Sequence, residues 1–307
     1  MPDVAVSIVN TNNRDLLLAC LESLRSVDAE LVVLDNASED GSADAVRERF
    51  PHVRVIAQTF RTGFAANHNT VIRGSDSRYV CVLNEDTTSS DWGLARMVAF
   101  LDANPRAAAL GPRLVYPDGG HQPSAWRFPG PGTSLLGLPT LGRVGIVQST
   151  GRHPRRVDWL MGAALLLRRE ALDEVGLFDE GFFLYSEEVD LCRRLRAAGW
   201  DIWYFPSVTV VHHESQFSAD IPARRIHEQW RSRHRYWRKH HSAAGARLAA
   251  VATGAQYALR GAAAALSRRD PAFRARMRLH AQDSWHVHGP GLRELAEEWN
   301  GRVGAAR

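Results

Sequence analysis

The chain contains 307 residues, of which 45% are hydrophobic and 23% charged, and its formal net charge is +4. These proportions are typical of a soluble globular protein, and the length suffices for one large domain or for one domain with an appendage. Three cysteines, an odd number without paired spacing, indicate buried thiols in a reducing compartment.

Two segments indicate where in the cell the protein is expected. Residues 4–9 enter a strand pattern directly, without the basic region and apolar core of a signal peptide. The most membrane-like segment, Leu248 to Leu266, is interrupted by Gln256 and Arg260 and would make a poor spanning helix. We therefore expect a cytoplasmic protein, either free or bound to the inner face of the cell membrane.

Short apolar strand patterns alternate with helical patterns in the first part of the chain. The predicted strands are Val4–Val9, Leu31–Leu34, Val53–Ala57 and Tyr79–Leu83. The last is an unbroken apolar run, which is typical of a central strand buried on both faces. A helix over Trp92–Leu101 and a strand over Ala107–Leu110 follow. This alternation predicts an α/β fold with a parallel sheet and right-handed crossovers.

Each of the first four strands ends in polar residues: Asn10–Asn12, Asp35–Asn36, Gln58–Arg61 and Asn84–Asp86. Because parallel strands end at one edge of a sheet, these residues are expected to converge on one cleft. The hard oxygens of the last group suit Mg²⁺ or Mn²⁺, which in turn suit a diphosphate. A solvated turn, in which Asn and Asp are ordinary, is the alternative for that group.

The stretch 112–156 is rich in Gly and Pro and has few periodic signals. It is predicted to be an irregular, functional or mobile loop, with a linker between two domains as the alternative. An apolar strand pattern returns over Val157–Arg168. Strand-like runs at Ile202–Phe205 and Val208–Val211 then precede His212 and His213.

Three acids, Glu187, Glu188 and Asp190, follow an aromatic-rich loop and begin a helix. Carboxylates are favoured at a helix N-terminus by the dipole, so they could simply cap it. The same pattern would also form one wall of an active site.

From residue 221 the chain becomes helical and basic. Residues 224–241 carry six Arg and one Lys against the single acid Glu228, interleaved with Trp230, Tyr236 and Trp237. This pattern fits a helix at an anionic membrane surface. A nucleic-acid-binding helix and a solvated helix face packed on the main domain are the alternatives.

Taken together, several segments resemble glycosyltransferase family 2, the inverting transferases of the GT-A fold, and within it the bacterial rhamnosyltransferase-like group. The resemblance covers roughly residues 3–218 and rests on the order and spacing of six motifs. These are VSIVNTNNRDLLLACLESL, VVLDNASEDGS, TGFAANHN, VLNEDTT, the segment from VDWLMG to RAAGW, and VVHHESQFS. It implies a GT-A domain over 1–220, with a Rossmann-like, mostly parallel sheet flanked by helices, and a helical basic extension over 221–307.

The resemblance also implies a role for each matched residue. Asn10, Thr11, Asn12, Asp35, Asn36, Gly63, Phe64, Asn67, Asn84 and Glu85 match positions that bind the nucleotide-sugar. Asp86 and His212 match the ligands of Mn²⁺ or Mg²⁺, with His213 as a substitute for His212. Trp159, Met161 and Gly162 match the acceptor side. Thr11 stands where the family usually has an aromatic residue, and Asn84 replaces the first acid of the metal-binding DXD motif.

Glu188 matches the catalytic base, which is usually Asp in the family, while Glu187, Asp190 and Arg194 would support it. The implied reaction is metal-dependent inverting transfer of a sugar from a nucleoside diphosphate sugar to a hydroxyl of a glycan or a polyprenyl-diphosphate-linked acceptor. Cell-envelope polysaccharide synthesis is the expected setting, with thymidine-diphosphate rhamnose as the expected donor. Peripheral membrane contact through 224–307 is expected, and a nucleic-acid partner is not.

Several alternatives remain open at this point. UDP-hexose or UDP-galactofuranose could be the donor, and a small molecule could be the acceptor. A degenerate GT-A protein that only binds sugars is the non-enzyme alternative, favoured by the differences at Thr11, Asn84 and Glu188. A nicotinamide-dependent oxidoreductase and a nucleotidyltransferase are disfavoured because TNNRDL, after the first strand, contains no glycine.

Overall fold

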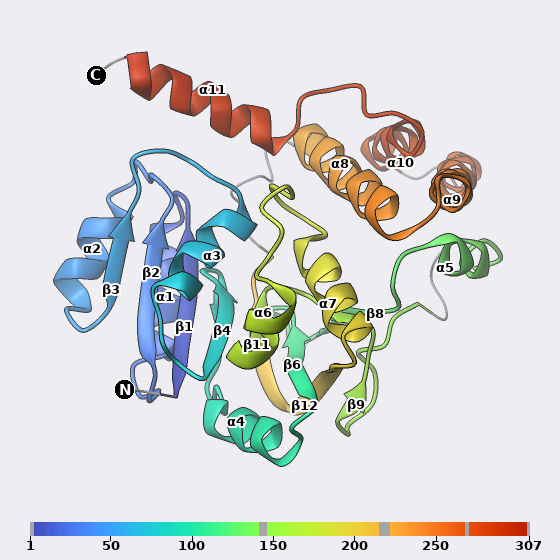
Figure 1. Cartoon of the computed structure of the whole chain (residues 1–307). Helices are drawn as coiled ribbons and strands as arrows, with labels where there is room; N and C mark the ends of the chain where they lie inside the picture. Colours follow the sequence, from blue (N-terminus) through green and yellow to red (C-terminus); the bar gives the residue numbers. More distant parts are fainter. Residues whose placement is uncertain (1–2, 141–145, 215–221, 268–269, 306–307) are drawn as a thin grey trace.

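The computed structural model describes residues 3–140, 146–214, 222–267 and 270–305 (Figure 1). The strands are β1 (Val4–Asn10), β2 (Glu30–Asp35), β3 (Arg54–Ala57), β4 (Tyr79–Asn84), β5 (Thr87–Thr88), β6 (Ala107–Val115), β7 (His121–Gln122), β8 (Ala125–Trp126), β9 (Arg155–Arg156), β10 (Trp159–Leu160), β11 (Ala164–Arg168) and β12 (Asp201–His212). The helices are α1 (Arg14–Ser23), α2 (Ser42–Arg49), α3 (Phe64–Arg73), α4 (Leu94–Ala103), α5 (Pro131–Leu136), α6 (Arg169–Val175), α7 (Glu187–Ala197), α8 (Pro222–His240), α9 (Ala243–Leu266), α10 (Pro271–Asp283) and α11 (Leu292–Ala305).

The main sheet has the strand order β3-β2-β1-β4-β11-β6-β12-β5. The expected parallel pairing holds from β3 to β4, since β1 pairs in parallel with β2 and β4, and β2 with β3. β11 lies between β4 and β6 and is antiparallel to both, which makes the sheet mixed. The reversal arises because the loop after β6 returns the chain to the edge where β4 ends. From there β11 can only run back through the sheet.

Two strand predictions differ from the structure in extent. The apolar run Val157–Arg168 is divided between β10 and β11. The two runs on either side of Pro206 form the single strand β12, whose register against β6 shifts between Phe205 and Thr209. Proline cannot donate a ladder hydrogen bond, so an interruption at this point is expected.

The sheet is covered on both faces, and the alternation of side chains along β4 shows how. Tyr79, Cys81 and Leu83 pack into the core that contains α1, α2 and α4. Val80 and Val82 point the other way, into the core that contains α3, α6 and α7. Because successive side chains of a strand face opposite sides, an unbroken apolar run is what a strand between two cores requires. All three cysteines are buried free thiols, as predicted.

Of the helices after residue 221, α8 and α11 lie over the edge at which the parallel strands end, and α9 and α10 lie to the side, beside α8 (Figure 1). Trp230, Tyr236 and Trp237 of α8 form a third core with Phe182 and Val189, the latter from α7. The tryptophans of the basic stretch are therefore packing residues. No helix in the described part of the chain is long and apolar enough to cross a bilayer. The predicted boundary between 1–220 and 221–307 lies outside the described residues and remains a prediction.

The last helix, α11, is fixed to the loop before α3 by three contacts. The side chain of Asn300 accepts a hydrogen bond from the backbone N–H of Arg61 at 2.7 Å and donates one to its carbonyl at 2.9 Å. The Arg61 guanidinium lies 4.2 Å from the Trp299 ring centroid. Trp299 in turn donates to Glu39 at 2.8 Å. The C-terminal helices thus close one side of the strand-end edge.

Candidate active site

A cleft of about 860 Å³ lies between the strand-end edge and the C-terminal helices. Most of the predicted site residues line it. They are Thr11, Asn36, Gly63, Phe64, Asn67, Asn84, Glu85, Trp159, Met161, Gly162, Glu187, Glu188 and His212. Donor-side, acceptor-side and acidic residues predicted from separate motifs therefore share one cavity.

The remaining predicted residues do not line the cleft: Asn10, Asn12, Asp35, Asp86, Asp190 and Arg194. Asn10 donates from Nδ2 to Asp35 Oδ1 at 3.1 Å, and Asp35 Oδ2 accepts from the backbone of Ser38 at 3.0 Å. The carbonyl oxygen of the Asn12 side chain accepts from the backbone of Glu39 at 2.6 Å. These contacts fix the loop after β2, which carries Asn36 into the cleft. That Asn10, Asn12 and Asp35 contact the nucleotide remains a prediction.

At the end of β4, Asp86 and His212 come together because β5 and β12 pair antiparallel, with His212 opposite Thr87. His212 Nε2 lies 3.4 Å from Asp86 Oδ1 and 3.3 Å from Asn84 Nδ2. His212 Nδ1 donates to Gln122 Oε1 at 3.0 Å, which leaves the lone pair of Nε2 directed at Asp86 and Asn84. His213, the predicted substitute, does not line the cleft.

The donor atoms of Asp86 and His212 suit a divalent cation. Asp86 is 1% exposed, and within the described residues neither carboxylate oxygen has a hydrogen-bond partner. Buried carboxylate oxygens normally have one, so these two are available to a cation. In residues 3–140, 146–214, 222–267 and 270–305 there is no cluster of three His, Cys, Asp or Glu that could hold a metal alone. Mg²⁺ is commonly bound by one or two protein ligands together with substrate phosphates, and this pair fits that pattern.

Glu187 and Glu188 enter the cleft from a strained turn. Tyr185 and Ser186 both have φ of 68°, a left-handed conformation that costs energy in residues other than glycine. The turn begins α7 inside the cavity, so its first two residues line the cleft. Among the described residues, Oε2 of Glu187 and Oε2 of Glu188 are buried without a hydrogen-bond partner.

Burial decides the protonation of this pair. It raises the pKa of Glu188 to about 7. Burial and then the neighbouring Glu188 charge raise the pKa of Glu187 well above its usual range. A carboxylate that titrates near neutral pH is a competent general base. The sequence left open that these acids only cap the helix. Capping alone does not account for two buried carboxylate oxygens that have no hydrogen-bond partner among the described residues, on side chains that line a cavity.

One turn into the same helix, Asp190 is fully buried and fixed by cations. It accepts from Arg194 Nε at 2.8 Å and from His240 Nε2 at 2.7 Å, and Lys239 Nζ lies 2.8 Å away. Arg194 also donates to the backbone carbonyls of 175–177. These contacts join α7 to α8 and to the loop before α7, consistent with the supporting role predicted for Asp190 and Arg194.

Two stacked tryptophans form one wall of the cleft. Trp126 and Trp159 are opposite each other in the β8–β10 pair, with ring centroids 4.5 Å apart and an interplanar angle of 23°. Trp159 Nε1 donates to the Arg127 carbonyl at 3.0 Å, which fixes its ring. A flat aromatic surface of this kind suits the apolar face of a sugar ring. Trp126 lies in the stretch predicted to be irregular.

A backbone contact holds the acidic turn against the start of α3. Phe64 N–H donates to the Phe183 carbonyl at 2.8 Å, and a Cβ on Gly63 would lie 2.3 Å from that oxygen. Only glycine permits this approach. On the other side, the Phe64 ring packs against Gly162 and His68.

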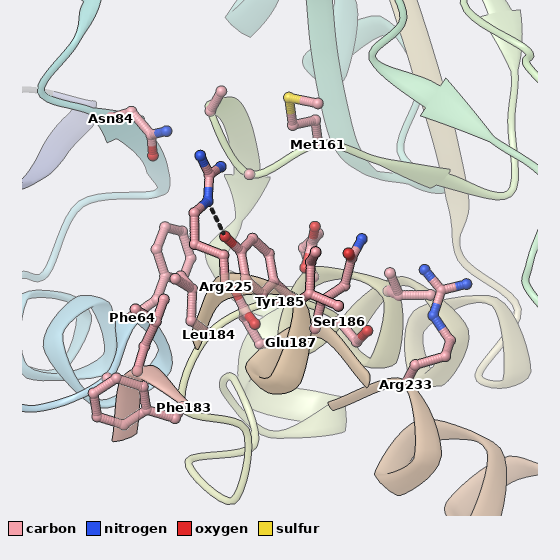
Figure 2. A pocket seen from close by; sticks show the side chains of 18 of the residues that line it. Phe64, Asn84, Met161, Phe183, Leu184, Tyr185, Ser186, Glu187, Arg225 and Arg233 are labelled. Carbon is pink, nitrogen blue, oxygen red and sulfur yellow. Dashed lines mark hydrogen bonds between the residues drawn. The ribbon is translucent and has the colours of Figure 1, made fainter. Parts of the chain in front are cut away.

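The helix α8 adds a wall that the sequence did not predict. Arg225 Nε donates to Tyr185 Oη at 3.1 Å, as the dashed line in Figure 2 shows. Arg225, Gln229 and Arg233 all line the cleft. For the basic stretch the sequence suggested a membrane surface, a nucleic-acid surface or a helix face packed on the main domain, and none of these placed it in the site.

The comparison of sequences agrees with this geometry. The glycosyl transferase family 2 profile matches residues 5–190, more than half of the chain. The chain belongs to glycosyltransferase family 2. The predicted family is thus confirmed, and the sheet, the acidic strand ends and the acidic turn described above all lie within or beside the matched region.

Two rhamnosyltransferases and a solved mannosyltransferase structure are similar to this family 2 glycosyltransferase. The N-acetylglucosaminyl-diphospho-decaprenol L-rhamnosyltransferase of Mycobacterium tuberculosis is 33% identical over 264 residues, which are 79% of this chain and 85% of the relative. Rhamnosyltransferase WbbL of Escherichia coli K12 is 23% identical over 222 residues, 68% of this chain and 83% of WbbL. A mannosyltransferase from Pyrobaculum calidifontis, solved with GDP-Man and Mn²⁺, has a TM-score of 0.61 at 19% identity, covering 94% of this chain and 88% of that one. This structural likeness confirms the GT-A fold.

Proposed function

We propose that this glycosyltransferase transfers rhamnose, with inversion, from thymidine-diphosphate rhamnose to the sugar of a polyprenyl-diphosphate-linked acceptor in cell-envelope polysaccharide synthesis. The observation that carries the proposal is the single cleft in which the strand-end residues, Trp159 and Glu188 meet. The similarity to the mycobacterial rhamnosyltransferase, which extends over 79% of this chain, supports the choice of sugar and acceptor class.

The donor would lie against the ends of β1, β2 and β4. Thr11 and Asn36 line this part of the cleft and are joined by a hydrogen bond of 3.1 Å from Asn36 Nδ2 to Thr11 Oγ1. Asp86 and His212 would hold Mn²⁺ or Mg²⁺ together with the donor diphosphate. When bound, the cation would stabilise the negative charge on the departing diphosphate.

Glu188 would act as the base. Its carboxylate accepts the proton of the acceptor hydroxyl while the hydroxyl oxygen bonds to the anomeric carbon. The bond from that carbon to the diphosphate oxygen breaks on the opposite face, which inverts the configuration. A pKa raised by burial to about 7 keeps a useful fraction of Glu188 ionised at neutral pH and gives it the basicity that the step needs.

We propose that the protein docks on the membrane through an apolar surface of α5 and α9, here called the α5–α9 leucine surface. It consists of the exposed side chains Leu135, Leu136, Val251, Leu259 and Leu266. Ser134 Oγ and Thr253 Oγ1 are 3.0 Å apart where these helices meet, and both residues line the cleft. The apolar surface therefore adjoins the cavity that a lipid-linked acceptor would have to reach.

The basic residues of α8 contribute little to such docking. Several are paired with acids of the same chain: Arg224 with Glu298, Arg231 with Glu294, Arg235 with Asp179 and Lys239 with Asp179 and Asp190. The predicted membrane contact through 224–307 is therefore proposed for α9, with α5 added to it.

A donor panel tests the proposed function. The purified chain is incubated with Mn²⁺, an N-acetylglucosaminyl diphosphate carrying a short polyprenyl chain, and one nucleotide-sugar at a time. Transfer from thymidine-diphosphate rhamnose at a rate well above that from UDP-hexoses or UDP-galactofuranose is the expected result. Transfer from a UDP-sugar alone would replace the donor assignment. Binding of nucleotide-sugars without transfer to this or any related acceptor would favour the sugar-binding alternative.

A further inference from the structure

We propose that Arg233 of α8 binds the diphosphate of the lipid-linked acceptor, an assignment that rests on the proposed function. The mechanism above gives roles to the donor side, to Glu188 and to the tryptophan wall. It leaves unexplained why a helix outside the profile-matched region places guanidinium groups in the cleft.

The first observation is that three polar side chains of α8 lie on one face of the helix. Arg225, Gln229 and Arg233 are spaced four residues apart, and all three line the cleft. Residues four apart lie on one face of a helix, so this face presents two cations and an amide to the cavity. The stripe crosses the cleft from Tyr185 toward Glu188.

The second observation is the pairing of the other cations in this helix. Arg224, Arg231, Arg235 and Lys239 all form ion pairs with carboxylates, and Arg238 is exposed to solvent. Arg225 has the neutral phenol of Tyr185. For Arg233 the structure gives no hydrogen bond and no ion pair with any described residue, although most of this residue is removed from water. A desolvated guanidinium with no carboxylate in direct contact is unfavourable, and an anionic ligand bound to it would offset that cost.

The third observation is the position of Arg233 relative to the two substrates. Asn84, on the donor side, and Arg233 lie at opposite sides of the site, with Tyr185 and Ser186 between them (Figure 2). Arg233 is close enough to Glu188 for the two charges to interact. An acceptor sugar whose hydroxyl faces Glu188 carries its anomeric diphosphate on another ring carbon. That diphosphate therefore belongs on the acceptor side of the base, where Arg233 lies, rather than at the donor end.

The surroundings of Arg233 continue toward the proposed membrane face. Thr253 and Gln256 of α9 and Ser134 of α5 line the same cavity as Arg233, and Gln256 Nε2 donates to the Ser134 carbonyl at 2.6 Å. The α5–α9 leucine surface lies on these two helices. An acceptor placed this way has its sugar at Trp126 and Trp159, its diphosphate at Arg233 and its lipid chain leaving along α5 and α9.

Two acceptors test the assignment: an N-acetylglucosaminyl diphosphate with a short alkyl chain, and an alkyl N-acetylglucosaminide with the same chain and no phosphate. For the diphosphate acceptor, Arg233→Gln should raise KM about 10- to 100-fold, with Arg233→Lys in between. For the phosphate-free acceptor the KM of the variant should stay close to that of the wild type. Arg224→Gln, in the same helix and paired with Glu298, is the matched control and should behave as wild type with both.

The alternative role for Arg233 is to set the charge state of Glu188. In that case Arg233→Gln would lower kcat equally with both acceptors and move the pH–rate profile, and the assignment would be overturned. A second readout needs no turnover: farnesyl diphosphate is titrated into the protein in chelator with saturating nucleotide. Binding that is weakened about tenfold or more by Arg233→Gln supports the site, and equal or absent binding in wild type and variant refutes it. Wild-type protein inactive on both acceptors, but still binding farnesyl diphosphate through Arg233, would refute the proposed function alone.

Discussion

His212 Nε2 faces Asp86 Oδ1 across 3.4 Å, while Nδ1 of the same ring donates a hydrogen bond to Gln122 Oε1. The hydrogen bond from Nδ1 to Gln122 fixes the tautomer that a metal ligand requires. The two buried oxygens of Asp86 supply the negative charge. This pair is the basis for the metal dependence that we propose.

The first prediction concerns that pair. Asp86→Asn should weaken nucleoside diphosphate binding about 10- to 100-fold in Mn²⁺ and leave it unchanged in chelator, because only the bridging cation is lost. Gln122→Leu should give a smaller loss in Mn²⁺, as expected for a residue that orients a ligand. Isothermal titration with and without Mn²⁺ measures both. Equal binding by Asp86→Asn and wild type in Mn²⁺ would contradict the metal assignment.

The second prediction is a pH dependence set by Glu188. The base must be ionised, and burial raises its pKa to about 7, so kcat should fall about tenfold for each pH unit below 7 and level off above it. Glu188→Gln should bind donor normally, lose about 10²–10⁴ in kcat and lack this limb. Stopped assays from pH 5 to 9 provide the profile. A wild-type limb near pH 4.5, or full activity in Glu188→Gln, would eliminate Glu188 as the base.

The third prediction tests the contact between Gly63, at the start of α3, and the acidic turn before α7. Gly63→Ala would place a methyl group 2.3 Å from the Phe183 carbonyl, so it should lower stability by about 1–3 kcal/mol and also reduce activity. Gly132, whose added Cβ would meet no described atom within 4 Å, is the control. Gly132→Ala should melt at or slightly above the wild-type temperature. Identical melting of both variants in a calorimeter would contradict the close contact.

The fourth prediction concerns the tryptophan wall. Trp126→Ala removes one ring of the stacked pair, so KM for the acceptor should rise about tenfold while donor affinity stays the same. Trp126→Phe should recover most of the loss. Steady-state kinetics with each substrate varied in turn separates the two effects, and a change in donor KM alone would place this wall on the donor side.

The fifth prediction concerns the α5–α9 leucine surface. The double variant Leu136→Glu, Leu259→Glu should lose most binding to vesicles that contain anionic lipid, because charges replace exposed apolar contacts. Tyr116→Glu, at an exposed apolar residue after β6, should bind as wild type. Flotation of vesicles with each protein provides the comparison. Absence of vesicle binding by the wild type would end the docking proposal.

Local pattern explains which parts of this structure could be predicted. The first four strands could be predicted because a hydrophobic run is a local signal. Glu188 could be predicted because the order of the motifs resembles that of the family. The reversal at β11 could not, since it depends on where the chain returns to the sheet after β6. Gln122 is recognised only through the pairing of β7 with β6. Arg231 and Lys239 pair with acids that are distant in the sequence, whereas Arg233 lines the cleft. This difference likewise depends on tertiary packing.

The most direct test of the whole account is the anomeric configuration of the product. The wild type and Glu188→Gln are given thymidine-diphosphate rhamnose, Mn²⁺ and the N-acetylglucosaminyl diphosphate acceptor, and the product is analysed by NMR. We expect a rhamnosylated acceptor whose anomeric configuration is inverted relative to the donor, formed by the wild type and nearly absent with the variant. A product with retained configuration, or one formed equally by both proteins, would contradict displacement assisted by Glu188.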